Sequence, residues 1–285
     1  MSAPAGPQAP HPPLPGSRPS TGAPRQPNGR VPTGKAPTQD LADRETTDRD
    51  TTDRDTTDRD TTDPYCLSAG AADELLADAP WRRFAVLGDG VVDGRGDSTP
   101  GYRDIGWADR VAGALARRRG TPADFAYCNL AERERRTAEI RTGQLARALA
   151  FRPDLALVVA GSNDVLRRDF ERCDDVLADY DAIVTALQAA GADVVTATIF
   201  DVTRSPRVPD DRKAPLHRRL DHLAGRIRLV ARARRTLHLD LAGHPAEREP
   251  DVYGRDIRFA TRRGQAIGAA ALVRRLGRHL GTTAG

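Results

Sequence analysis

Between residues 83 and 280, short apolar runs alternate with longer segments in which apolar side chains recur at helical spacing. The apolar runs have the length of buried strands and cover residues 83–87, 125–130, 155–160, 193–199 and 237–241. The amphipathic segments cover residues 105–119, 138–150, 175–190, 216–235 and 261–280. This alternation predicts βαβ units, and therefore a parallel sheet with helices on both faces. We expect a doubly wound, three-layer α/β/α fold.

The N-terminal 70 residues follow a different pattern. Eleven of the 21 prolines lie in the first 40 residues, and residues 46–63 read TTDRD three times and then TTD. Because branched aliphatic and aromatic side chains are almost missing here, burial cannot offset the entropy that ordering would cost. We therefore expect residues 1–70 to form a disordered tail and residues 71–285 to form one domain.

The charge pattern bears on possible partners. The net charge is +4, and Lys35 and Lys213 are the only lysines, so nearly all basic residues are arginine. Acidic residues are mixed among them and few aromatic residues accompany them. This pattern favours a solvated mixed-charge surface over a nucleic-acid site.

The cysteines bear on cofactors and on the compartment. Cys66, Cys128 and Cys173 are far apart and form no C-x-x-C pair, which argues against a disulfide framework and a zinc site. We expect no metal and no cofactor. No apolar segment approaches the roughly 18 residues that span a bilayer, and the N-terminus lacks the pattern of a signal peptide. We expect a cytoplasmic protein that does not bind membranes.

In a doubly wound sheet, ligands bind beyond the carboxyl ends of the strands. The sequence there is LGDGVVDG after the first strand, NLAERERRT after the second, GSND after the third, and GRDIRFATRRG before the last helix. These segments cover residues 87–94, 129–137, 161–164 and 254–264.

These four segments, in this order, resemble the GDSL or SGNH hydrolase family, and the resemblance extends over residues 81–280. It implies a flavodoxin-like hydrolase fold of the lipase/esterase type. In that family the first segment carries a serine nucleophile after a Gly-Asp pair. The second segment supplies a glycine amide and the third an asparagine side chain as oxyanion donors. The last segment reads DxxH, in which histidine is the base and aspartate orients it.

This chain departs from the family pattern at the reacting groups. Gly90 stands at the serine position and cannot form an acyl-enzyme, and Phe259 stands at the histidine position and cannot take a proton. Glu134 falls at the oxyanion glycine, where a carboxylate would repel the developing charge. Asn163 and Asp256 are retained. The catalytic set is not intact, and we expect a degenerate member without ordinary serine esterase activity.

Three functions follow from this interpretation. In the first, the cleft binds a small ligand or a protein partner of unknown identity. The binding candidates are Asp89, Gly90, Glu134, Asn163, Asp164 and Arg258. In the second, the protein is a hydrolase or acyltransferase on a small ester that uses substituted groups, with Glu134 or Asp89 as acid/base and Asn163 polarising the substrate. In the third, it is an interaction module that acts through its tail and its arginine-rich helices.

Structural roles compete with these functional ones. Asp89 and Asn163 can equally serve to hold turns or cap helices, and Asp256 can bond within its own loop. Ser98 and Ser162 could act as substitute nucleophiles. We expect neither to lie in a tight turn after a strand with a histidine within reach. His217 and the other histidines near it in sequence lie outside the last segment.

Overall fold

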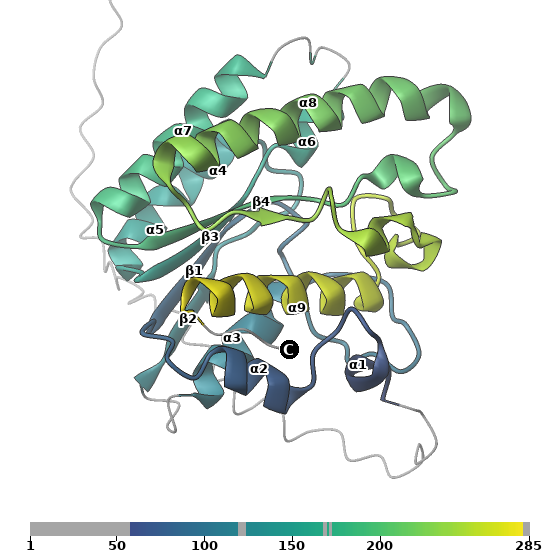
Figure 1. Ribbon diagram of the computed structural model, residues 1–285. Coiled ribbons are helices and arrows are strands. Elements are labelled where there is room, and N and C mark those ends of the chain that lie inside the picture. The colour runs from purple at the N-terminus through teal and green to yellow at the C-terminus, as the bar shows by residue number, and fades with distance from the viewer. Residues whose placement is uncertain (1–57, 119–123, 168–169, 171–172, 282–285) are drawn as a thin grey trace, which may run out of the picture. The chain divides into compact units, whose positions relative to one another are not determined.

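A computed structural model describes residues 58–118, 124–167, 170 and 173–281. Its centre is a five-stranded parallel sheet with the strand order β2-β1-β3-β4-β5 (Figure 1). The strands are β1 (Arg83–Gly88), β2 (Ala126–Asn129), β3 (Leu155–Val159), β4 (Asp193–Thr198) and β5 (Leu239–Asp240). The expected α/β class with a doubly wound parallel sheet is confirmed.

Helices cover both faces of the sheet (Figure 1). The first layer holds α2 (Ala69–Leu75), α3 (Trp107–Arg117) and α9 (Arg262–His279), with α1 (Arg59–Thr62) beside it. The other layer holds α4 (Thr137–Gly143), α5 (Leu145–Phe151), α7 (Asp174–Ala189) and α8 (Asp210–Arg234), with the short α6 (Ser162–Val165). Three short 3-10 turns are η2 (Val202–Arg204), η3 (Pro245–Arg248) and η4 (Pro250–Val252).

The continuous apolar run of β3 shows why two layers are needed. All five of its residues are buried. Leu155 and Leu157 pack with α3 and α9, whereas Ala156 and Val158 pack with α7 and α8. Side chains alternate across a strand, so a run that is apolar at every position needs cover on both faces.

Two elements differ from the sequence prediction. The helix expected over residues 138–150 is divided into α4 and α5 at Gln144. The Gln144 side chain accepts a hydrogen bond from Gly88 N and donates one to Gly88 O, both at 2.9 Å, and so ties this break to the end of β1. The helix expected from residue 216 begins at Asp210, so Pro215 lies inside α8.

Residues 58–70 fold, contrary to the expectation that the tail extends to residue 70. Asp60, in the last repeat, forms ion pairs with Arg103 at 2.7 Å and Arg110 at 3.0 Å. Asp63 forms one with Arg263, also at 2.7 Å. Both aspartates are almost fully shielded from water, and paired arginines compensate for that burial. The rest of the expected tail, residues 1–57, lies outside the described residues.

Candidate functional site

Loops from three strands and the loop before α9 meet at the carboxyl end of the sheet, as the sequence predicted. They surround one small hollow, whose lining residues are Asp89, Gly90, Val91, Glu134, Ser162, Asn163, Arg258 and Phe259. Its volume of about 10 Å³ is room for roughly one water molecule. Most of the residues predicted from the sequence therefore come together, but around almost no free space.

The contact between Gly90 and Phe259 closes the hollow. A Cβ atom added to Gly90 would lie 2.7 Å from Cε1 of Phe259, well inside the roughly 3.5 to 4.0 Å of a carbon–carbon contact. The guanidinium groups of Arg133 and Arg258 lie over the same ring, 5.0 and 5.8 Å from its centroid. The ring therefore occupies the space that a serine side chain at position 90 would need.

Two acidic residues of this region, Glu134 and Asp256, are paired with Arg258. Its Nη1 lies 3.1 Å from Oε1 of Glu134, and its Nη2 lies 2.7 Å from Oδ2 of Asp256. Hydrogen bonding to Arg258 lowers the pKa of Asp256, so this carboxylate stays ionised beside a cation instead of orienting a base. The backbone of Glu134 is left-handed, with φ 61°, a conformation that glycine adopts readily and that suits the glycine of the resemblance.

Asn163 and Asp164 hold loops in place. The side-chain amide of Asn163 donates to the carbonyl oxygen of Arg135 at 3.0 Å, so one of its two N–H groups is already used. Asp164 accepts from both N and Oγ1 of Thr137, at 3.0 and 2.9 Å, and thereby links α6 to the start of α4. These contacts favour the structural interpretation of Asn163, and they give Asp164, predicted as a binding candidate, a structural role.

Asp89 is fully buried behind the turn that carries Gly90. Its carboxylate accepts from Val91 N at 3.0 Å and from the hydroxyl of Ser162. Burial raises the pKa of Asp89 to about 6, against the lowering effect of these two hydrogen bonds. Asp89 therefore holds the loop after β1 and the loop after β3 together.

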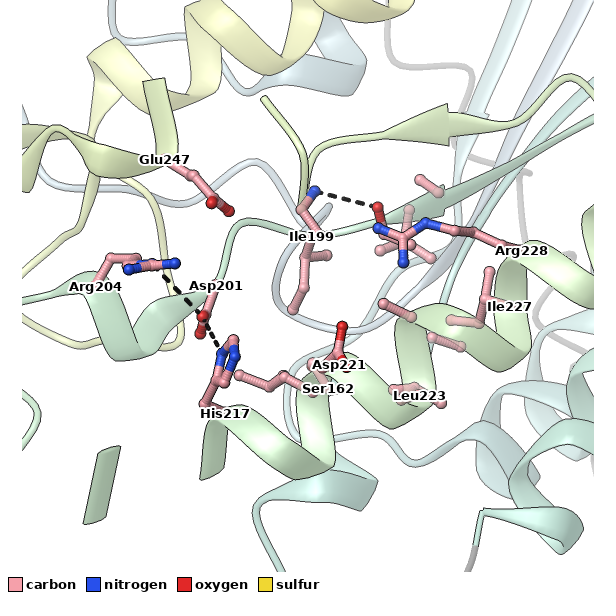
Figure 2. A pocket seen from close by; sticks show the side chains of 17 residues that line it. Ser162, Ile199, Asp201, Arg204, His217, Asp221, Leu223, Ile227, Arg228 and Glu247 are labelled. Atoms are coloured by element: carbon pink, nitrogen blue, oxygen red, sulfur yellow. Dashed lines mark hydrogen bonds and ion pairs between the residues drawn. The ribbon is translucent and has the colours of Figure 1, made fainter. Parts of the chain in front are cut away.

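A larger cavity lies beside this hollow, between the carboxyl ends of β3 and β4 and one face of α8 (Figure 2). Its volume is about 150 Å³. Sequence reasoning missed it because its wall comes from α8, whose side chains carry no motif. Ser162 lines both spaces.

The most polar part of this cavity contains a paired histidine and aspartate. Nδ1 of His217 lies 2.6 Å from Oδ2 of Asp201, which is buried at the end of β4. Ser162 follows β3 after Ala160 and Gly161, whose φ is 103°, and it lines the same cavity as His217. Its hydroxyl donates to Asp89. Because Asp201 follows the fourth strand in the sequence, its place at this edge of the sheet could have been predicted. Its pairing with a residue of the next helix could not.

Two negative findings apply to the described residues. No three His, Cys, Asp or Glu side chains there are grouped so that they could hold a metal ion. No helix in those ranges is both long and apolar enough to cross a bilayer.

The fold and the site define a class: an α/β protein with a flavodoxin-like parallel sheet whose loop residues converge at its carboxyl edge. More narrowly, the model of the GDSL-like Lipase/Acylhydrolase family matches residues 86–262, and the chain belongs to this family. The resemblance inferred from the four segments is confirmed.

Solved structures agree on the fold. Axe2, an acetylxylan esterase from Geobacillus stearothermophilus, superposes with a TM-score of 0.54 at 18% identity, covering 69% of this chain and 94% of that one. A GDSL-like lipase from Parabacteroides merdae gives 0.57 at 16% identity, covering 69% and 95%. No match was found among curated protein sequences.

Proposed function

We propose that this member of the GDSL-like family does not hydrolyse esters at the family's serine position. One observation carries the proposal: a Cβ atom at Gly90 would lie 2.7 Å from Cε1 of Phe259, so this ring fills the space of the missing side chain. Two further contacts support it. Asp256 is paired with Arg258, and the amide of Asn163 is bonded to a backbone carbonyl. Gly90 offers no side chain as a nucleophile, and Phe259 cannot take a proton.

The test is hydrolysis of p-nitrophenyl acetate and p-nitrophenyl octanoate by the purified full chain. We expect turnover no higher than that of the Asn163→Ala variant, with both proteins folded by circular dichroism. Turnover that Asn163→Ala abolishes would overturn the proposal, because the amide would then be stabilising an oxyanion.

The Gly90→Ser, Phe259→His double variant is the matched gain-of-function test. It restores both reacting groups and removes the ring that closes the hollow. We expect esterase turnover to appear in this variant, and to increase when Glu134→Gly replaces the carboxylate at the oxyanion glycine.

The sequence predicted that a small ligand binds around Gly90. The volumes of the two spaces favour a different place. The hollow at the family position holds roughly one water molecule, whereas the adjacent cavity is about 150 Å³. We propose that any small ligand of this protein binds in the adjacent cavity, next to α8.

A second candidate function is a hydrolase with relocated groups. It is favoured by one observation: Ser162 lines the same cavity as the His217–Asp201 pair. A serine-directed fluorophosphonate probe tests it. Labelling that disappears in both Ser162→Ala and His217→Gln, but persists in the exposed control Ser98→Ala, would establish this activity. We expect no labelling, because the Ser162 hydroxyl donates to the buried Asp89.

We further propose that the protein works in a reducing compartment such as the cytoplasm. Cys66, Cys128 and Cys173 are free thiols, and burial raises the pKa of Cys66 to about 12. Thiol titration of the unfolded protein, purified without reductant, should find three thiols. A lower number that reductant restores to three would contradict the proposal.

A further inference from the structure

The cavity beside α8 has an apolar wall and one strongly polar end. Leu220, Leu223, Ala224 and Ile227, all buried, form the wall along α8. Residues three and four apart share one face of a helix, so this spacing turns all four side chains toward the sheet. The wall can receive an apolar group without requiring polar contacts from it.

The polar end is rich in hydrogen-bond acceptors. A carboxylate oxygen accepts hydrogen bonds, so Nδ1 of His217 donates to Oδ2 of Asp201 at 2.6 Å. Asp221 follows His217 by one turn on the same face of α8 and is exposed at the rim of the cavity.

Glu247 adds a carboxylate with one unsatisfied oxygen. It reaches the cavity from η3, and Figure 2 shows it and His217 on opposite sides of Asp201. Its Oε2 is shielded from water and has no hydrogen-bond partner among the described residues. A buried polar atom in this state loses the hydrogen bonds it made to water, so a donor placed nearby is stabilising.

The two arginines of the cavity bind other carboxylates directly. Arg228 forms two hydrogen bonds to Asp240, both at 2.9 Å. Arg204 is half-exposed, and its Nε lies 3.8 Å from Asp201, the carboxylate that already pairs with His217. Within the part of the chain that the structure describes, neither arginine forms an ion pair with Asp221 or Glu247, although the charge of Arg228 acts on Asp221 and that of Arg204 on Glu247 at longer range. Burial outweighs these charges at Glu247 and raises the pKa of its carboxyl group.

We propose that this cavity binds a small organic amine. Its ammonium group donates to the unpartnered Oε2 of Glu247 at the polar end, and the carboxylate of Asp221 lies at the rim. Its apolar body lies along α8, against Leu223 and Ile227. An apolar cavity of about 150 Å³ takes up a molecule of the size of benzene, which sets the size of that body. The proposal does not depend on the absence of esterase activity.

The experiment is calorimetric titration of the full chain with three probes of one size: benzylamine, benzyl alcohol and benzoate. Because a hydrogen bond to a charged partner is stronger than a neutral one, we expect benzylamine to bind about tenfold more tightly than benzyl alcohol. We expect no measurable binding of benzoate. Equal affinity for the three probes, a preference for benzoate, or no binding of benzylamine would overturn the proposal.

Two variants locate the binding. Glu247→Gln keeps the shape but removes the charge, and should weaken benzylamine about tenfold while leaving benzyl alcohol nearly unchanged. Glu74→Gln makes the same change at an exposed position on α2, outside the cavity lining, and should have no effect. Unchanged benzylamine affinity in Glu247→Gln would place the amine elsewhere and overturn the assignment.

Ala224→Leu fills the cavity without altering charge and should abolish binding of both benzylamine and benzyl alcohol. Its unfolding midpoint is measured first. If this variant does not fold, the Glu247→Gln comparison decides the question alone.

Discussion

Two spaces at the carboxyl edge of the sheet share Ser162 in their walls, yet they have opposite character. Around Gly90, Glu134 pairs with Arg258, Asn163 donates to a backbone carbonyl, and the Phe259 ring fills the space beside Gly90. Beside α8, the wall is apolar, the space is about 150 Å³, and Glu247 has an oxygen without a partner.

This difference shows how a catalytic position can close while the neighbouring cavity stays open. The loops around Gly90 contact one another. Where one loop carries a small residue, a side chain of another loop can therefore fill the space. The cavity wall instead belongs to α8, whose position is fixed by packing on the sheet through residues such as Leu223 and Ile227. The two spaces can therefore be perturbed separately.

The largest expected effect concerns the cavity wall. Leu223 is 5% exposed and contacts Gly161, where an added Cβ would lie 2.7 Å from Cδ2 of Leu223. Leu223→Ala should lower the free energy of unfolding by about 2 to 5 kcal/mol, since it removes buried methyl groups and enlarges the cavity. Denaturant unfolding measures this. Leu229→Ala, at an outward position of α8 that is 55% exposed, should change it by less than about 0.5 kcal/mol.

The next effect is a pH dependence at the closed site. Burial raises the pKa of Asp89 to about 6 in the folded state, from 3.8. The folded state binds this proton more tightly, so the contribution to stability is fully present below pH 3.8 and is lost as pH rises toward about 6. Above that pH, the buried carboxylate costs up to about 3 kcal/mol.

Asp89→Asn should remove this dependence. Between about pH 3.5 and pH 7, wild type should lose up to about 3 kcal/mol of unfolding free energy relative to the variant. Asp78→Asn, at an exposed aspartate, is the control and should track wild type throughout. Parallel pH profiles for wild type and Asp89→Asn would show that Asp89 does not titrate in this range.

A smaller effect tests whether Phe259 closes the site. Gly90→Ser alone should destabilise the fold by about 1 to 3 kcal/mol, because the new Cβ meets the ring. In the Phe259→Ala background, the same substitution should cost little. A double-mutant cycle by denaturant unfolding measures this coupling, and additive effects of the two substitutions would mean that the ring does not close the site.

The smallest effect is at Glu134, whose backbone φ is 61°. Glu134→Gly should be more stable than Glu134→Ala by about 1 kcal/mol, because only the glycine adopts this conformation without strain. Both variants lose the exposed ion pair with Arg258, so that loss cancels in the comparison. Thermal unfolding of the two variants side by side provides the measurement. Equal stability would argue against left-handed backbone at this position.

Much of the fold could be predicted because its signals are local. The apolar run of β3 and the helical spacing of α7 and α9 each lie within one segment of sequence. The break at Gln144 could not be predicted, since its cause is a pair of hydrogen bonds to Gly88, far away in the sequence. The folding of residues 58–70 was missed for the same reason, because Asp60 and Asp63 depend on arginines of α3, of α9 and of the loop before α3.

By itself, the sequence determined the fold class, the family, the loops that meet at the sheet edge, and the absence of a serine at position 90 and a histidine at position 259. These depend on residue identity and periodicity, which are properties of the chain alone. Only the tertiary structure decided that Phe259 fills the space beside Gly90 and that His217 pairs with Asp201 at the end of an open cavity. Such contacts join residues of different segments, and their distances are set by how helices and loops pack on the sheet.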